Sequence, residues 1–266
     1  IWPEACLPAF LSEQENGSMR GGPKVESVFE SIHSLGDFTF VLGLNEVRGE
    51  TVVDPDVDRL AIVNEDGSMF GEEYTLVACA DYVLGKTKGN TVSNLSSSRA
   101  LRDITQKHGG NYMASAVGEV NVVTSMKSIN AVIGGEGNGG IIYPESHYGR
   151  DALVGVALFL SLLAERKIAV STLRASYPSY FMSKKKIDLI PTTDVDKILA
   201  AIKVKYDQEE ISTIDGVKID FPNKWVHLRK SNTEPIIRIY TEAPTQKAAD
   251  NLGNKIINEI KEVAGI

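Results

Sequence analysis

Apolar runs of strand length alternate with helix-like segments between residues 60 and 166. The predicted strands are 60–63, 91–96 and 130–135, and the predicted helices are 72–86, 98–110 and 151–166. A helix that connects two successive strands acts as a crossover, which leaves those strands parallel. The sequence therefore predicts an α/β fold, with a mixed or mainly parallel sheet and flanking helices.

The last part of the chain follows a different order. Its predicted elements are a helix at 194–206, strands at 217–221, 225–229 and 236–240, and a helix at 245–263. Strands that are grouped between helices indicate a separate α+β domain. We expect the linker at 182–191, where a run of lysines and an Ile-Pro step interrupt the pattern.

The composition restricts the class of protein. The 266 residues are 42% hydrophobic and 24% charged, with a formal net charge of −7, as in soluble globular proteins. This acidity argues against a nucleic-acid partner. Cys6 and Cys79 form no CxxC pair, which excludes a disulfide framework and a thiolate zinc site and predicts a cytoplasmic protein. The most apolar stretch, 152–164, is too short to cross a membrane, so no membrane partner is expected, whereas a homo-oligomer is compatible with the sequence.

Three aspartates stand at alternate positions in the segment VVDPDVDRLAIV, directly before a predicted strand. Asp54, Asp56 and Asp58 repel one another unless a cation neutralises them, and hard oxygen ligands select Mg²⁺ or Ca²⁺. An EF-hand is excluded, because its loop needs glycine at the sixth position, where Arg59 stands. Pro55 and Arg59 favour a metal and phosphate site over the alternative, a solvated acidic turn.

A glycine-rich segment, IGGEGNGG, follows the strand predicted at 130–135. Glycines allow the backbone to approach a ligand closely. Pro144 follows too soon for a helix, so a dinucleotide-binding fingerprint is not supported. Glu136 and Asn138 are polar groups suited to sugar hydroxyls, and the alternative is a flexible turn without a ligand.

A third polar segment, LRKSNTEPIIRIYTE, joins two predicted strands near the C-terminus. It contains Arg229, Ser231, Asn232, Thr233 and Arg238. Guanidinium groups with hydroxyl and amide donors are suited to a phosphate dianion. The alternative is a polar hairpin turn with two exposed arginines.

Together, and in this order, the three segments resemble those of the α-D-phosphohexomutases, which include phosphoglucomutase, phosphomannomutase and phosphoglucosamine mutase. The resemblance extends over residues 51–266. It implies Mg²⁺-dependent phosphoryl transfer between a phosphoserine and a hexose phosphate, in four domains of which the last resembles the TATA-binding protein. The implied division is a partial second mutase-like domain with an atypical N-terminal segment and the metal loop at 1–74, a sugar-binding α/β domain at 75–182, and a phosphate-binding α+β domain at 183–266.

The resemblance also implies roles for single residues. Asp54, Asp56 and Asp58 match the family's DGDGDR-type loop and would hold Mg²⁺. The residues implied to be catalytic are Arg59, beside the transferred phosphoryl group, with Glu119 and His147 in the cleft. The residues implied to bind the hexose phosphate are Glu136 and Asn138 at sugar hydroxyls, and Arg229, Ser231, Asn232, Thr233 and Arg238 at the phosphate.

The sequence departs from the family pattern at several positions. Asn138 and Gly140 replace the usual serine and histidine of the GExSGH loop, and Val120 stands where many members have a basic residue. No serine loop of the TASHNP type precedes Asp54. We therefore expect a truncated form that binds metal and phosphosugar but does not complete the mutase cycle alone.

Two other functions remain compatible with the sequence. One is a glycoside hydrolase, which needs two suitably spaced carboxylates. Its candidate acids are Asp54, Asp56, Asp58, Glu119, Glu136 and Glu145. The other is a non-catalytic module that binds a sugar phosphate or another carbohydrate.

Overall fold

The computed structural model describes residues 51–190, 193–231 and 234–265, preceded by three short strands. These strands are β1 (Ser12–Glu13), β2 (Met19–Arg20) and β3 (Phe40–Val41). The rest of the atypical segment predicted before residue 51 lies outside the described residues. β3 pairs in parallel with β4 (Thr51–Val53), and β4 pairs antiparallel with β5 (Leu60–Ile62).

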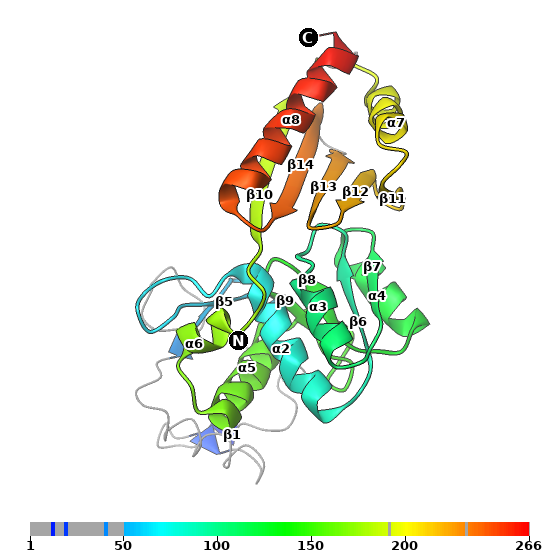
Figure 1. Ribbon diagram of the computed structural model, residues 1–266. Helices are drawn as coiled ribbons and strands as arrows, with labels where there is room; N and C mark the ends of the chain where they lie inside the picture. The colour runs from blue at the N-terminus through cyan, green and yellow to red at the C-terminus, as the bar shows by residue number, and fades with distance from the viewer. Residues whose placement is uncertain are drawn as a thin grey trace.

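A four-stranded sheet lies at the centre of the first unit, in the order β7-β6-β8-β9 (Figure 1). Its strands are β6 (Asn90–Asn94), β7 (Tyr112–Ser115), β8 (Ala131–Glu136) and β9 (Gly140–Ile142). β6 pairs in parallel with β7 and β8, while β9 returns antiparallel to β8. The mainly parallel, mixed sheet confirms the predicted fold class.

Within residues 51–190, five helices accompany this sheet. They are α2 (Glu72–Lys86), α3 (Ala100–Lys107), α4 (Glu119–Ser128), α5 (Ala152–Arg166) and α6 (Val170–Ala175). α2 is buried along most of its length and packs against α3, α5 and β8. α5 begins after Asp151, whose carboxylate accepts hydrogen bonds from two backbone N–H groups of the first turn. The helices predicted at 72–86 and 151–166 are confirmed, whereas α4 and α6 are not predicted by the sequence.

An antiparallel sheet forms the second unit, in the order β10-β14-β13-β12-β11 (Figure 1). Its strands are β10 (Phe181–Asp188), β11 (Glu210–Ser212), β12 (Val217–Phe221), β13 (Lys224–Lys230) and β14 (Ile236–Ala243). The helices α7 (Val195–Lys205) and α8 (Gln246–Ala264) share one hydrophobic core with these strands. This arrangement confirms the predicted α+β character.

The linker predicted at 182–191 is wrong for most of its length, because residues 181–188 form β10 at the edge of the second sheet. Ser183 and Ile187 are buried, and the lysines between them alternate between partly buried and exposed. The aliphatic part of the Lys185 side chain packs against α8, and its Nζ donates a hydrogen bond to Asn254 at 2.8 Å. A lysine run is therefore compatible with an edge strand, where charged side chains also discourage pairing with other molecules.

Arg99, at the start of α3, joins the two units. Its guanidinium donates hydrogen bonds to the carbonyl oxygens of Lys224 at 3.0 Å and Pro222 at 3.2 Å, and Nε lies 3.5 Å from Glu242 Oε1. Glu242 is fully buried and also accepts a 2.7 Å hydrogen bond from Trp225 Nε1. Burial raises the pKa of Glu242, against the effect of these hydrogen bonds and of the Arg99 charge. The junction is thus a buried ionic contact rather than a purely apolar one.

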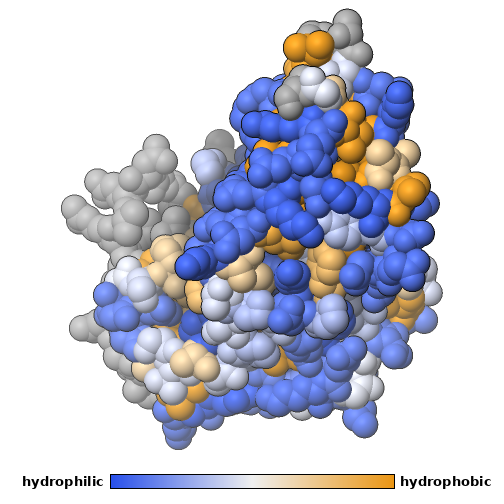
Figure 2. Space-filling view, turned by 45° about the horizontal axis from the view of Figure 1, so that its top comes forward, coloured by the Kyte–Doolittle hydropathy of each residue, from blue (hydrophilic) through white to orange (hydrophobic). Residues whose placement is uncertain are grey.

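The face of the molecule shown in Figure 2 is largely hydrophilic, and its hydrophobic residues lie in small groups among polar ones. The exposed large apolar side chains belong to separate elements and include Met69, Val120, Ile190 and Val204. Among the helices that the structure describes, none has both the length and the apolar character that a membrane crossing requires.

Replacing Arg99 by alanine should lower the free energy of unfolding by about 3 kcal/mol, because Glu242 would stay buried without its cation. Urea unfolding at pH 7, followed by circular dichroism, measures this loss. Arg102→Ala is the matched control on the same helix: its side chain is 36% exposed and pairs with Asp103, so we expect a loss below about 1 kcal/mol. Equal losses in the two variants would contradict the proposed importance of the junction.

Candidate functional site

The turn between β4 and β5 holds the three predicted metal ligands. Asp54 Oδ1 accepts hydrogen bonds from the backbone N–H groups of Asp58 at 3.2 Å and Arg59 at 3.1 Å. Arg59 Nε donates to Asp54 Oδ2 at 2.6 Å. Asp56 is exposed in the same turn. The turn therefore brings Asp54, Asp58 and Arg59 together, while Asp56 faces solvent.

The two inner aspartates have opposite pKa shifts. Burial by itself would raise the pKa of Asp54, but hydrogen bonds from the side chain and backbone of Arg59 outweigh it, so the pKa is lowered. Burial raises the pKa of Asp58, and the neighbouring Asp54 adds to this against the attraction of Arg150. Asp58 is therefore the carboxylate that depends more on a nearby cation.

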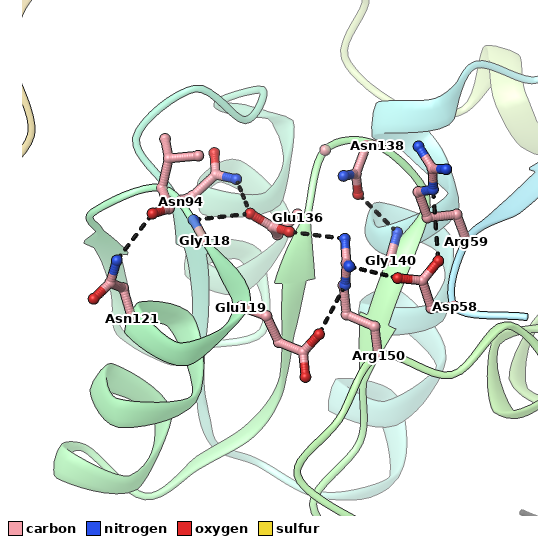
Figure 3. A network of polar contacts seen from close by, with 12 residues as sticks. Asp58, Arg59, Asn94, Gly118, Glu119, Asn121, Glu136, Asn138, Gly140 and Arg150 are labelled. Atoms are coloured by element: carbon pink, nitrogen blue, oxygen red, sulfur yellow. Dashed lines mark hydrogen bonds and ion pairs between the residues drawn. The ribbon is translucent and has the colours of Figure 1, made fainter. Parts of the chain in front are cut away.

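Arg150 provides that cation and is the centre of the site (Figure 3). Its guanidinium pairs with Asp58 from the β4–β5 turn, with Glu119 Oε2 at 3.0 Å from the start of α4, and with Glu136 Oε2 at 3.0 Å from the end of β8. The Arg150 side chain is 21% exposed, so these charges interact where water screens them only in part. We refer to Asp58, Glu119, Glu136 and Arg150 as the Arg150 network.

Glu136 is the most buried carboxylate of the network. Its Oε1 accepts hydrogen bonds from Asn94 Nδ2 at 2.8 Å and from the backbone N–H of Gly118 at 3.2 Å (Figure 3). Asn94 ends β6 and Gly118 follows β7, because the carboxyl ends of the parallel strands meet at one edge of the sheet. Arg150 lies just before α5 and bridges to Ile142 at the end of β9. The side chain of Glu136 is therefore fixed in orientation, while Asn138 accepts a 3.2 Å hydrogen bond from the N–H of Gly140 within the hairpin.

Gly139 places the glycine-rich hairpin against the aspartate turn. Its φ is 87°, a conformation that favours glycine, and a Cβ atom here would lie 2.3 Å from the carbonyl oxygen of Leu60. The Gly139 carbonyl accepts a 3.0 Å hydrogen bond from the N–H of Leu60. The β8–β9 hairpin and the start of β5 are thus in direct backbone contact, which brings the predicted sugar-binding and metal-binding residues together.

His147 lies in the connection between β9 and α5. Its Nε2 is 2.9 Å from Asp151 Oδ2, and its side chain is 46% exposed. Asp151 uses its other oxygen to cap α5. Glu119 and His147 both lie beside Gly149, so two of the residues predicted to be catalytic are neighbours. The catalytic role of His147 stays a prediction.

The predicted phosphate-binding residues lie on β13 and β14. Arg229 and Arg238 are direct neighbours across these two strands. Arg229 Nε is buried, makes no hydrogen bond among the described residues, and lies 2.9 Å from Asp215 Oδ2. Arg238 is exposed, and Ser231 follows directly after β13. Asn232 and Thr233 lie outside the described residues.

Three residues of this site were missed by the sequence reasoning. They are Arg150, Asn94 and Asp215. Arg150 is separated from Asp58 by most of the α/β unit, and no local spacing relates the two. One physical argument in the sequence points to Arg150. A cluster of acidic side chains needs a cation, and Arg150 is a cation that directly precedes the helix predicted at 151–166.

Two family models match this chain. The model described as "Phosphoglucomutase/phosphomannomutase, alpha/beta/alpha domain III" matches residues 71–180. The model described as "Phosphoglucomutase/phosphomannomutase, C-terminal domain" matches residues 183–259. The chain therefore belongs to the phosphoglucomutase/phosphomannomutase family and covers its C-terminal portion.

Relatives and solved structures agree with this assignment. The chain is 34% identical over 212 residues to a phosphoglucomutase/phosphomannomutase of Thermococcus kodakarensis, covering 77% of this chain and 46% of that protein. It is 34% identical over 215 residues to a phosphoglucosamine/phosphogalactosamine mutase of Sulfurisphaera tokodaii, covering 79% and 46%. A crystal structure of a family protein from Burkholderia thailandensis superposes with a TM-score of 0.69 at 24% identity, covering 90% of this chain and 50% of that one. The chain thus spans about half the length of the relatives it matches.

Removing the central cation should be costly. Arg150→Met would leave Asp58, Glu119 and Glu136 close together without their shared partner, and we expect a loss of about 2 kcal/mol in the free energy of unfolding at pH 7. Thermal and urea unfolding measure this loss. Arg102→Met, which removes the same charge from an exposed position on α3, should cost less than about 1 kcal/mol. A loss in Arg150→Met no larger than in this control would contradict the central role of Arg150.

Proposed function

We propose that this chain binds a hexose phosphate together with Mg²⁺ and forms the sugar-binding and phosphate-binding parts of a phosphohexomutase. The observation that carries the proposal is the Arg150 network, which unites one residue predicted at the metal, one at the catalytic centre and one at the sugar hydroxyls. The family membership supports the same substrate class, because the relatives are named as sugar-phosphate mutases.

The proposed sugar site is centred on Glu136 and Asn138. Glu136 is held by donors from two strand ends and by Arg150, so its carboxylate is positioned before a ligand arrives. A carboxylate that accepts hydrogen bonds from sugar hydroxyls gains charge-assisted contacts. Glu119 and His147, which lie beside Gly149, are proposed to face the reacting end of the sugar.

The proposed phosphate site is formed by Arg229 and Arg238, with the segment 231–233 between them. The Arg229 side chain is 23% exposed and its Nε pairs with Asp215. A guanidinium group has several N–H donors, so Arg229 can also bind an anionic ligand. Arg238 adds a second cation on the neighbouring strand. Two guanidinium groups in adjacent register can share the oxygens of one phosphate.

The residues proposed for Mg²⁺ are Asp54, Asp56 and Asp58. Their hard oxygens fit this ion, and Asp58 Oδ1 is buried without a hydrogen bond. Within the described residues, however, no group of three acidic, histidine or cysteine side chains is arranged to hold a metal ion. Instead, Arg59 forms an ion pair with Asp54, and Arg150 forms one with Asp58. We infer that Asp58 releases Arg150 when the ion binds. When bound, Mg²⁺ would offset negative charge on the transferred phosphoryl group.

A structurally similar protein has been solved with a sugar phosphate and with magnesium. N-acetylphosphoglucosamine mutase of Aspergillus fumigatus has been solved in complex with GlcNAc-6P and magnesium, and it superposes with a TM-score of 0.56 at 14% identity, covering 79% of this chain and 51% of that one. This likeness establishes the fold, and the two ligands of that complex support the proposed ligand classes. Because these 266 residues contain no TASHNP-type serine loop, we propose that they do not complete the mutase cycle by themselves.

The glycoside hydrolase alternative is not supported. The matching family models and the relatives named above are described as mutases. Glu119 and Glu136, two of its candidate acids, pair with the same guanidinium, whereas glycoside hydrolysis needs one carboxyl group that carries a proton for the leaving group.

Calorimetric titration with glucose 1-phosphate, with and without Mg²⁺, tests the proposal. We expect binding by the wild-type chain, with affinity reduced about tenfold or more in Glu136→Gln, because a charged acceptor for sugar hydroxyls is lost. Asp56→Asn should weaken the binding of Mg²⁺ measured alone. Glu145→Gln is the matched control, since Glu145 is exposed and accepts a hydrogen bond from the nearby Tyr143.

Absence of glucose 1-phosphate binding by the wild-type chain would contradict the proposal, as would equal losses in Glu136→Gln and Glu145→Gln. The same preparation, supplied with a hexose bisphosphate, should show no sustained isomerisation of glucose 1-phosphate. Sustained turnover would contradict the claim that these residues are insufficient for the cycle.

A further inference from the structure

Asp215 lies at the contact between the two units and bonds to both of them. It occupies the turn between β11 and β12, and its Oδ2 accepts a 3.0 Å hydrogen bond from the backbone N–H of Val117 in the α/β unit. The same oxygen lies 2.9 Å from Nε of Arg229 on β13. A single carboxylate oxygen therefore connects the proposed phosphate-binding arginine to the loop that follows β7.

The next residue of that loop leads to the proposed sugar site. The N–H of Gly118, adjacent to that of Val117, donates to Glu136 Oε1 at 3.2 Å. The N–H group of Val117 therefore bonds to Asp215, which pairs with Arg229. The N–H group of the next residue, Gly118, bonds to Glu136. These two N–H groups belong to adjacent peptide units that share the Cα atom of Val117, so this arrangement limits the spacing between Arg229 and Glu136.

The local fold of the second unit places Asp215 for this contact. Gly216 has a φ of 70°, and a Cβ atom at this position would lie 2.1 Å from the carbonyl oxygen of Leu228. Only glycine allows this close approach of the β11–β12 turn to β13. The approach brings the Asp215 carboxylate beside the residue that follows Leu228, which is Arg229.

A buried histidine makes a second connection at the same point. His227 Nε2 lies 2.6 Å from the carbonyl oxygen of Asp215, and its Nδ1 lies 2.9 Å from the hydroxyl of Ser96 in the α/β unit. Burial lowers the pKa of His227 to about 4. At neutral pH the ring is therefore uncharged, so it can donate to Asp215 and accept from Ser96 at the same time. Both the backbone and the side chain of Asp215 are thereby fixed.

We propose that Asp215 is a positioning residue that holds Arg229 at the correct distance from Glu136, so that the chain recognises phosphate and sugar hydroxyls of one ligand together. This inference rests on the proposed hexose phosphate site. It assigns Asp215 no contact with the ligand. Its expected effect is on ligands that reach both ends of the site, because a ligand that contacts Arg229 alone does not depend on the distance to Glu136.

Paired titrations with inorganic phosphate and glucose 1-phosphate test this role. In Asp215→Ala we expect the dissociation constant of glucose 1-phosphate to rise about tenfold, because Arg229 is no longer held in place. The affinity for inorganic phosphate should stay the same or increase, because a carboxylate that competes for Arg229 has been removed. Retained phosphate binding also shows that the variant is folded.

Two further variants complete the test. In Asp215→Asn the amide oxygen can accept from Val117 and Arg229 as Oδ2 does, so the ratio of the two affinities should return close to that of the wild type. Asp207→Ala, which removes an exposed acidic group that accepts a hydrogen bond from its neighbour Gln208, should leave both affinities unchanged. If Asp215→Ala does not fold, Asp215→Asn decides the question.

Equal weakening of both ligands in Asp215→Ala, or no change in either, would overturn the positioning role while leaving the proposed function intact. If Asp215→Asn behaves like Asp215→Ala, the negative charge of Asp215 matters rather than its placement of Arg229. That result would also overturn the positioning role. If the wild-type chain binds phosphate but not glucose 1-phosphate, or neither of them, the proposed function fails, and this inference fails with it.

Discussion

The site depends on one guanidinium group that is shared by three carboxylates. Arg150 pairs with Asp58, Glu119 and Glu136, which come from a strand turn, a helix start and a strand end. Without the cation, these partly buried acids would repel one another and separate the loops that carry them. The same guanidinium group also pairs with Asp58, a predicted metal ligand, so an ion bound at Asp58 would compete with Arg150.

The contact between the two units is a second requirement for a site that spans both. Arg99 and Glu242 form its buried ionic part, and Asp215 with His227 connects the loops nearest to the proposed ligand. Such polar junctions depend strictly on geometry, because a displaced partner leaves a buried charge without compensation. We therefore infer that these contacts set the separation of Arg229 and Glu136, the residues proposed for the phosphate and the sugar.

Local periodicity was sufficient to predict much of the fold. The helices α2 and α5 and the strands β12, β13 and β14 follow from their apolar patterns and nearby turn residues. β10 was mistaken for a linker, because its lysines are acceptable only once the strand lies at a sheet edge against α8. Arg150 and Asp215 could not be predicted, since their partners are distant in sequence and no local pattern encodes a contact of that kind.

The central claim is that one hexose phosphate is bound across both units. A crystal structure of the chain with glucose 1-phosphate and Mg²⁺ tests this most directly. We predict the phosphate at Arg229 and Arg238, sugar hydroxyls at Glu136, and the ion at Asp58 in place of Arg150. A phosphate bound away from the two arginines, or a sugar that makes no contact with Glu136, would contradict the account.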